Sequence, residues 1–157
     1  MALETMILGN VVKPDLSLSG IAELTKTLQA SNKVIEVPVK HRFIPGLYIR
    51  EVYVPAGSGI VTMVHKTENP FVVSKGKVLV WTKEDGVVCI EAPFTGITKP
   101  GTCRLCLVLE DLIWTTFHPN PTNETDIEKI EKMLAWSPQE YAQLEEKENK
   151  CLSSQSE

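Results

Sequence analysis

Hydrophobic and polar residues alternate with a period of two from residue 34 to residue 118, in short runs separated by turn residues. Successive side chains of a β-strand point to opposite faces, so this pattern predicts strands with one buried face. The predicted strands are residues 34–39, 47–55, 60–65, 71–74, 77–82, 87–92, 95–98, 104–110 and 112–118. No helical pattern interrupts them, which indicates an all-β core, an antiparallel sandwich or barrel.

The period becomes helical on both sides of this region. Before it, a short helix is predicted over about residues 20–29, with Ser17 or Ser19 as its cap. The apolar face of that helix consists of Ile21, Leu24 and Leu28. The chain therefore divides into an N-terminal arm (1–33), a barrel (34–118) and a helical extension (119–157).

Two helices are predicted in the extension. The first begins near Asp126 and is capped by residues 123–125. Its apolar stripe consists of Ile127, Ile130, Met133 and Leu134. The second begins with Ser137 as N-cap, Pro138 in its first position and Glu140 closing a capping box. Tyr141 and Leu144 are predicted to face inward, and the last ten or so residues to be frayed or disordered.

Composition narrows the function classes. The chain has 157 residues, a formal net charge of −4 and no basic stripe, which argues against binding nucleic acid. It has no apolar run of transmembrane length and no signal-peptide pattern at its start, so neither a membrane role nor export is expected. We therefore expect a cytoplasmic protein.

The segment 55–118 resembles the cupins, whose first motif places a histidine six residues after a glycine, as His65 follows Gly59 here. It is most similar to short cupins encoded by tailed phages and prophages. The residues that carry this resemblance are Pro55-Ala56-Gly57, His65-Lys66-Thr67-Glu68, Ser74-Lys75-Gly76-Lys77, Val80-Trp81-Thr82, Ala92-Pro93, Lys99-Pro100-Gly101-Thr102, Leu109-Glu110-Asp111 and Trp114-Thr115-Thr116-Phe117-His118. The resemblance implies a jelly-roll barrel and a location in the host cytoplasm.

Enzymatic cupins hold a divalent metal through three histidines and a glutamate, and this chain matches that set only at His65. Thr67, Asn69 and Arg104 stand at the other positions, and a fixed guanidinium repels a cation. No cofactor is therefore predicted. The alternative is a degenerate metal site made of His65, Glu68 and His118.

A ligand site in the barrel is the other candidate. Arginine pairs with phosphate or carboxylate, and aromatic rings stack on planar groups. The predicted ligand-binding residues are His65, Thr67, Arg104, Arg50, Tyr48, Trp81, Trp114 and His118. The alternatives are that the arginines lie outside in surface ion pairs, that the tryptophans are plain core residues, and that the histidines are structural.

Cys103 and Cys106 have zinc-like spacing, but no second pair completes a structural zinc site. They are predicted to be buried, inert thiols.

Three functions follow. The first is a non-catalytic phage or prophage cupin that binds a small polar or anionic molecule, nucleotide- or sugar-like, inside the barrel. The second is a metal-dependent cupin enzyme with a degenerate site. The third is a virion accessory or host-factor-binding protein. Under each of them a homodimer or a higher homo-oligomer is expected.

Overall fold

The computed structural model describes residues 17, 20, 23, 26, 30 and 36–154. It divides into two compact units, Ile35–Ala135 and the residues before and after that segment, and each unit is described by itself. The barrel was predicted to end at residue 118, whereas the unit Ile35–Ala135 continues to residue 135. It includes the end of the strand Leu105–Asn120 and a helix whose residues pack on Tyr48.

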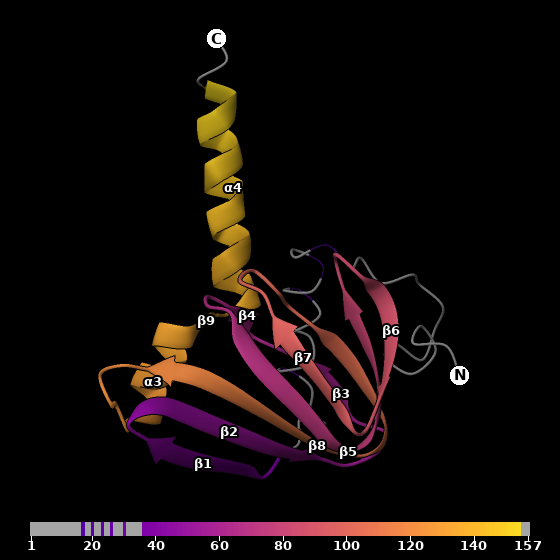
Figure 1. Ribbon diagram of the computed structural model, residues 1–157. Coiled ribbons are helices and arrows are strands. Elements are labelled where there is room, and N and C mark those ends of the chain that lie inside the picture. Colours follow the sequence, from indigo (N-terminus) through magenta and orange to yellow (C-terminus); the bar gives the residue numbers. More distant parts are fainter. Residues whose placement is uncertain are drawn as a thin grey trace. The chain divides into compact units, whose positions relative to one another are not determined.

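The unit Ile35–Ala135 is an antiparallel jelly-roll barrel (Figure 1). Its strands are β1 (Val39–Ile44), β2 (Gly46–Val54), β3 (Gly59–Val61), β4 (Val64–His65), β5 (Asn69–Thr82), β6 (Gly86–Glu91), β7 (Phe94–Thr98) and β8 (Leu105–Asn120). The main sheet has the order β1-β2-β8-β5-β6, and β3 also pairs with β8 while β7 pairs with β5. The predicted all-β, jelly-roll fold class is confirmed.

Two strands are longer than predicted, because each joins two predicted strands. Residues 71–74 and 77–82 lie in β5, and residues 104–110 and 112–118 lie mostly in β8. The register of the β5–β8 ladder shifts between Val73 and Val78, which is a β-bulge. Before the bulge the odd-numbered residues of β5 are buried, and after it the even-numbered ones are. The bulge therefore keeps both halves of β5 facing the core.

The first predicted strand, residues 34–39, differs from the structure in its described part, and its residues 34 and 35 lie outside the described residues. Residues 36–38 are not in a strand, and β1 begins at Val39 and runs to Ile44. Pro38 has no N–H group to donate to a ladder, so regular pairing starts after it. Pro45 and Gly46 form the turn of the β1–β2 hairpin, in which Gly46 has a φ of 79°.

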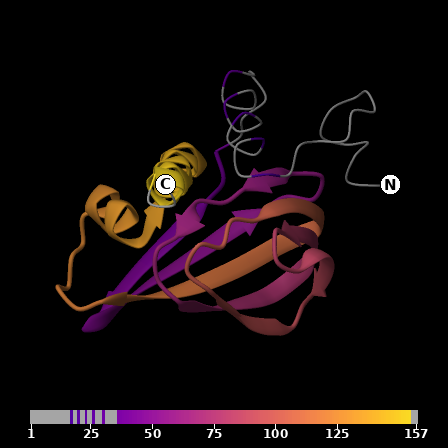
Figure 2. The same cartoon turned by 90° about the horizontal axis from the view of Figure 1, so that it is seen from above.

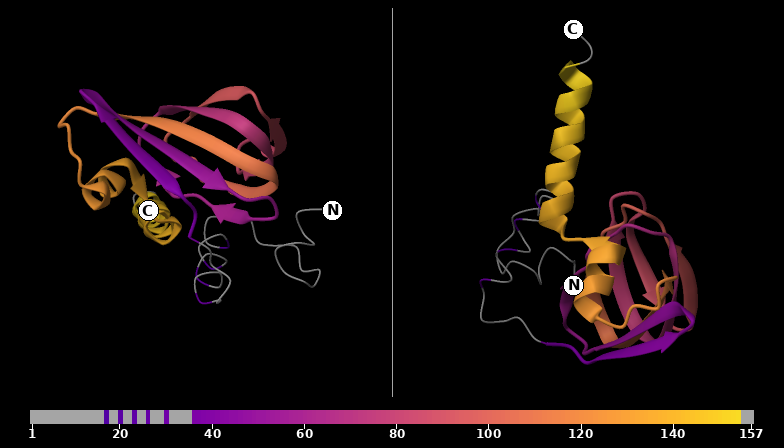
Figure 3. Two further views of the ribbon diagram at one scale, coloured as in Figure 1. Left: turned by 90° about the horizontal axis from the view of Figure 1, so that it is seen from below. Right: turned by 90° about the vertical axis from the view of Figure 1, so that its left-hand side faces the viewer.

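Nine buried residues form the barrel core: Val54, Phe71, Val73, Val78, Val80, Ile90, Cys106, Val108 and Leu112. The helix α3 (Ile127–Leu134) lies at one end of the barrel (Figure 2; Figure 3, right). Its buried residues Ile130 and Leu134 pack with Tyr48 of β2. A backbone hydrogen bond from Lys66 N to Leu134 O (2.8 Å) joins the end of α3 to the chain after β4.

The predicted cap and stripe of α3 need small corrections. The N-cap is Asp126, whose carboxylate accepts from Glu128 N and Lys129 N, rather than a residue of 123–125. Met133 is 44% exposed, so it is not part of the stripe. Residues 127, 130 and 134 follow the i, i+3, i+7 spacing of one face, and position 133 lies off it.

The other unit contains α4 (Pro138–Ser154), which follows the short segment β9 (Ala135–Trp136) at the boundary. The predicted capping box is confirmed, since Glu140 N donates to Ser137 Oγ (3.1 Å) and Ser137 N to Glu140 Oε2 (2.7 Å). Two predictions are wrong: Leu144 is 39% exposed, and residues up to Ser154 are helical. Glu, Lys and Gln are strong helix formers, so a charged segment does not have to be disordered.

The predicted N-terminal helix is only partly testable. Residues 20, 23, 26 and 30 are helical, and Ser17 Oγ accepts from Gly20 N (3.1 Å), as expected of a cap. The predicted apolar face, Ile21, Leu24 and Leu28, lies outside the described residues. In the described part of the chain, no helix combines the length and the apolar character that crossing a membrane requires.

Candidate functional site

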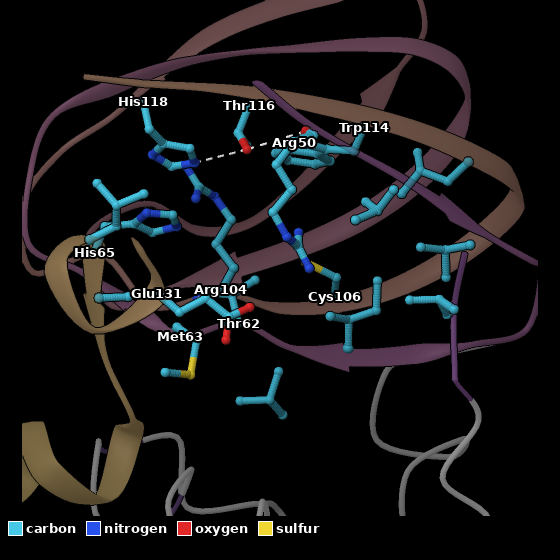
Figure 4. A pocket seen from close by; sticks show the side chains of 18 of the residues that line it. Arg50, Thr62, Met63, His65, Arg104, Cys106, Trp114, Thr116, His118 and Glu131 are labelled. Carbon is cyan, nitrogen blue, oxygen red and sulfur yellow. Dashed lines mark hydrogen bonds between the residues drawn. The ribbon is translucent and has the colours of Figure 1, made fainter. Parts of the chain in front are cut away.

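The barrel of unit Ile35–Ala135 contains a cavity of about 340 Å³, of the size that small-molecule sites have. Strands β2, β3 and β8, the segment from Thr62 to His65, and the last turn of α3 supply its walls. Figure 4 shows the labelled side chains converging on it from several elements. Its main polar and charged lining residues are Arg50, His65, Arg104, Thr116, His118 and Glu131.

Arg104 is a buried cation in this lining. It is 8% exposed, and its guanidinium donates to the Thr98 hydroxyl at 3.0 Å. The guanidinium carbon lies 5.1 Å from the centre of the Phe71 ring and 5.7 Å from that of Trp114. Burial lowers the pKa of this group, which still remains a cation at neutral pH. Among the described residues, no carboxylate forms an ion pair with it.

Arg50 is a second guanidinium on the same cavity, placed by β2. In the part of the chain that the structure describes, neither a hydrogen bond nor an ion pair of its side chain is found. The neighbouring Glu51 pairs instead with Arg42 at 3.3 Å, on the other face of the strand. Both arginines line the cavity, and neither forms an ion pair within the described residues, so the alternative that one or both lie outside in surface ion pairs is wrong.

An aromatic column runs from the surface to the cavity. The exposed His41 stacks on Tyr48 (centroids 5.9 Å apart), Tyr48 on His118 (5.8 Å), and His118 on His65 (6.1 Å). Tyr48 Oη and His41 Nδ1 form a 2.7 Å hydrogen bond, and His118 Nε2 lies 2.9 Å from Thr116 Oγ1. The column fixes the orientation of both cavity histidines.

Burial lowers the pKa of His65 to about 4 and that of His118 to about 4. The charge of Arg104 lowers the pKa of His65 further, and Arg50 does the same for His118. Both imidazoles are therefore neutral at pH 7. At that pH the cavity owes its positive charge to the arginines alone.

The free energy of unfolding is expected to fall by about 3–4 kcal/mol between pH 7 and pH 5. In the unfolded chain both imidazoles take up protons near pH 6.5, whereas in the folded protein they stay neutral down to about pH 4. Stability is thus fully present above pH 6.5 and is lost as the pH falls toward 4, because the unfolded state binds more protons.

Urea unfolding at the two pH values measures this difference. His118→Gln should remove about half of it, since each histidine contributes one proton. His41→Gln is the control for the pH dependence, because the His41 ring does not line the cavity; the loss of its bond to Tyr48 should lower stability at both pH values and leave their difference unchanged. Equal stability of the wild type at pH 7 and pH 5 would contradict the expectation.

The structure brings together six of the eight predicted site residues. These are Tyr48, Arg50, His65, Arg104, Trp114 and His118, and all of them line the cavity. That they bind a ligand remains a prediction.

Two predicted site residues do not line the cavity. Thr67 is exposed, because β4 ends at His65 and the chain bends at the next residues. Trp81 lies outside the lining because the bulge in β5 turns even-numbered residues such as Val80 and Thr82 inward.

Cys103 and Cys106 behave as predicted, whereas Cys89 is exposed rather than buried. Cys103 and Cys106 are buried, and Cys103 Sγ lies 3.3 Å from Thr62 O. Burial raises the pKa of Cys103 to about 11 and that of Cys106 to about 12, so both thiols stay protonated at pH 7. The side chain of Cys151 lies outside the described residues.

The residues around His65 do not fit a divalent metal. Glu68 is exposed and does not line the cavity, so the degenerate set retains only His65 and His118. Asn69, at the position of the cupin glutamate, is fully buried and neutral, and it also lies outside the lining. Within the described residues no group of three or more His, Cys, Asp or Glu gathers at one point. Two guanidinium groups on the cavity would further repel a cation.

The sequence did not single out Glu131 or Thr98. Glu131 lines the cavity from α3, and Thr98 of β7 holds the guanidinium of Arg104. A signal for Glu131 was present, because it lies one residue after Ile130 and three before Leu134, on the border of the helix's buried stripe. Thr98 carries no comparable signal, since its neighbourhood depends on the pairing of β7 with β5.

No family model and no curated protein sequence matches the chain. Solved cupin structures do match. A salicylate 1,2-dioxygenase from Pseudoaminobacter salicylatoxidans, solved as an adduct with gentisate, is 13% identical with a TM-score of 0.50 over 67% of this chain and 31% of that one.

An RmlC-like cupin family protein from Methanocaldococcus jannaschii is 10% identical (TM-score 0.46, 59% of this chain and 88% of that one). An uncharacterized double-stranded β-helix protein from Klebsiella pneumoniae is 17% identical (TM-score 0.48, 60% and 84%). The antiparallel jelly-roll barrel is therefore a fold that this chain shares with the dioxygenase. Such low identities inform on fold alone.

Proposed function

We propose that this protein is a non-catalytic cupin-fold protein that binds a small anionic molecule inside its barrel. The observation that carries the proposal is Arg104, a cation that is 8% exposed and whose hydrogen bond goes to a neutral hydroxyl, that of Thr98. A buried charge is costly unless an opposite charge accompanies it. In the described part of the chain no carboxylate pairs with Arg104, so a bound anion is the natural counter-charge.

Arg50 supports the same proposal. Its guanidinium reaches the same cavity, and two guanidinium groups at one site suit a carboxylate or a phosphate, which accept paired hydrogen bonds. Trp114 and the predominantly apolar walls would enclose the rest of the molecule.

The lining favours binding over catalysis. Cys106, the thiol on the cavity, is a poor nucleophile because burial raises its pKa to about 12. His118, a candidate base, is stacked between Tyr48 and His65, and Nε2 already contacts Thr116. A general base works best with a pKa near the working pH, and the pKa of His118 is about 4.

The resemblance of residues 55–118 to phage and prophage cupins supports a role in an infected or lysogenic host cell. A nucleotide- or sugar-like ligand, homo-oligomers and a virion or host protein as partner remain predictions of the sequence.

Native mass spectrometry of the purified protein, with elemental analysis, tests the proposed function. The expected result is a metal-free protein that releases an organic anion on denaturation. Near-stoichiometric Fe, Mn, Ni or Zn would contradict it and favour the metal-dependent alternative. A bare protein that also fails to bind any added anion would overturn it and leave the partner-binding alternative.

A further inference from the structure

The charges on the cavity nearly cancel. Among the described lining residues, Arg50 and Arg104 are cations and Glu131 is the anion. Two positive charges and one negative charge leave a formal charge of +1. The histidines add nothing at pH 7, because both are neutral there. A ligand with a single negative charge would complete the balance, and a dianion would exceed it.

The helix beside the cavity reinforces this limit. It is the last turn of α3 that lines the cavity, through Glu131, Leu134 and Ala135. The C-terminal end of a helix carries partial negative charge, which Lys132 in the last turn and the Lys66 ammonium that donates to Lys132 O offset in part, whereas phosphate sites are commonly built on N-terminal ends. Burial raises the pKa of Tyr48, the positive charge of Arg50 opposes that rise, and the negative charge of Glu131 adds a smaller rise, so Glu131 does act on a side chain of the cavity wall. Both features disfavour a phosphate dianion.

The walls suit an apolar body better than a sugar. Aliphatic side chains from several elements cover much of the cavity, among them Val37, Val52, Val54, Ile60, Leu112 and Leu134. The hydroxyl groups that reach it already have partners. Thr62 Oγ1 accepts from Arg104 N (2.8 Å), Tyr48 Oη pairs with His41 (2.7 Å), and Thr116 Oγ1 lies 3.4 Å from Arg50 O. A polyol would therefore leave many of its hydroxyl groups unpaired, each at a cost.

From these observations we infer that the ligand is a monocarboxylate with an apolar body, and that Glu131 disfavours ligands of higher charge. The inference rests on the proposed function, because it narrows the class of anion that the arginines hold. The guanidinium of Arg104, stacked near Phe71 and Trp114, would pair with the carboxylate, and the apolar walls would enclose the remainder.

Four small anions test separately how the charge of a ligand and the polarity of its body affect binding. Benzoate and phenyl phosphate share a ring, but the phosphate is a dianion at pH 8. Hexanoate and gluconate are both six-carbon monocarboxylates, but gluconate is a polyol. Isothermal titration at pH 8 should show that benzoate and hexanoate bind about tenfold or more tightly than their partners.

Substitution of Glu131 tests its role directly. Glu131→Gln should raise the affinity for phenyl phosphate by about three- to tenfold, and that for benzoate by less. The reason is that the carboxylate of Glu131 repels a dianion about twice as strongly as a monoanion. Glu128→Gln is the matched control: Glu128 and Glu131 are both exposed residues of α3 with the same charge, but only Glu131 lines the cavity. An equal gain in both variants would show a long-range effect and contradict the role of Glu131.

The outcomes distinguish this inference from the proposed function. If phenyl phosphate or gluconate binds more tightly than its partner, and Arg104→Met abolishes that binding, the cavity binds anions but the inferred class is wrong. If none of the four probes binds and the purified protein carries no anion, both are wrong. Tighter binding of both apolar carboxylates supports the inference.

Discussion

Gly76→Ala is expected to lower the free energy of unfolding by about 3–5 kcal/mol. Gly76 lies in the bulge of β5 with a φ of 91°, a conformation that residues with a Cβ rarely adopt. A Cβ at this position would lie 2.8 Å from Glu110 O and still closer to Asp111 O. Both are backbone atoms of β8, so they cannot move aside without disturbing the ladder between the two longest strands.

Gly57→Ala is the matched control, because Gly57 has a similar φ of 82° but nothing within 4 Å of the new Cβ. Gly57→Ala should lower the free energy of unfolding by about 1–2 kcal/mol, the cost of the strained backbone conformation alone. Urea unfolding followed by circular dichroism measures both variants. Equal losses would contradict the steric argument at Gly76, since strain alone would then explain both.

The fold could be predicted from the sequence because its information is local. Period-two alternation and turn residues such as Pro45-Gly46 place most strands, and the capping box at Ser137 places the start of α4. The continuity of β5 and β8 could not be predicted in this way. From the sequence alone, Gly76 indicates a turn between two strands. In the structure the chain continues through Gly76 as a β-bulge, because it stays paired with the backbone of β8.

Local sequence patterns also predict some residues of the candidate site correctly and miss others. Tyr48 and Arg50 were placed on one face of a strand by alternation alone, and both line the cavity. Trp81 follows a bulge, so counting alternate residues no longer gives the face to which it belongs. Glu131 borders the buried stripe of its helix, which the sequence shows, but its place on the cavity depends on how α3 packs against Tyr48, which the sequence does not show.

If the proposed function is right, the cation without a counter-charge in the cavity lowers the stability of the ligand-free protein. Arg104 is held by one hydrogen bond to a neutral group and by two aromatic rings, which compensate for only part of its desolvation. Buried groups of this kind are common at functional sites, where removing them stabilises the protein at the expense of activity.

Arg104→Met is therefore expected to have opposite effects on stability and binding. It should raise the free energy of unfolding of the ligand-free protein by about 1–3 kcal/mol, because methionine fills a similar volume without a charge. It should also weaken the binding of benzoate at least about 100-fold, because the carboxylate loses its buried partner. Thermal unfolding with and without 10 mM benzoate, at roughly saturating concentration for a weak ligand, measures both effects in one experiment.

Two further variants make the result specific. Arg42→Met removes an exposed guanidinium that pairs with Glu51 outside the cavity, so it should change stability little and leave the response to benzoate intact. Arg104→Lys keeps the charge but loses the planar group that stacks near Phe71 and Trp114, so it should weaken binding less than methionine does. If Arg104→Met instead destabilised the protein while Arg104→Lys did not, the positive charge would be a structural requirement of the barrel. The cavity would then have no unbalanced charge for an anion to neutralise.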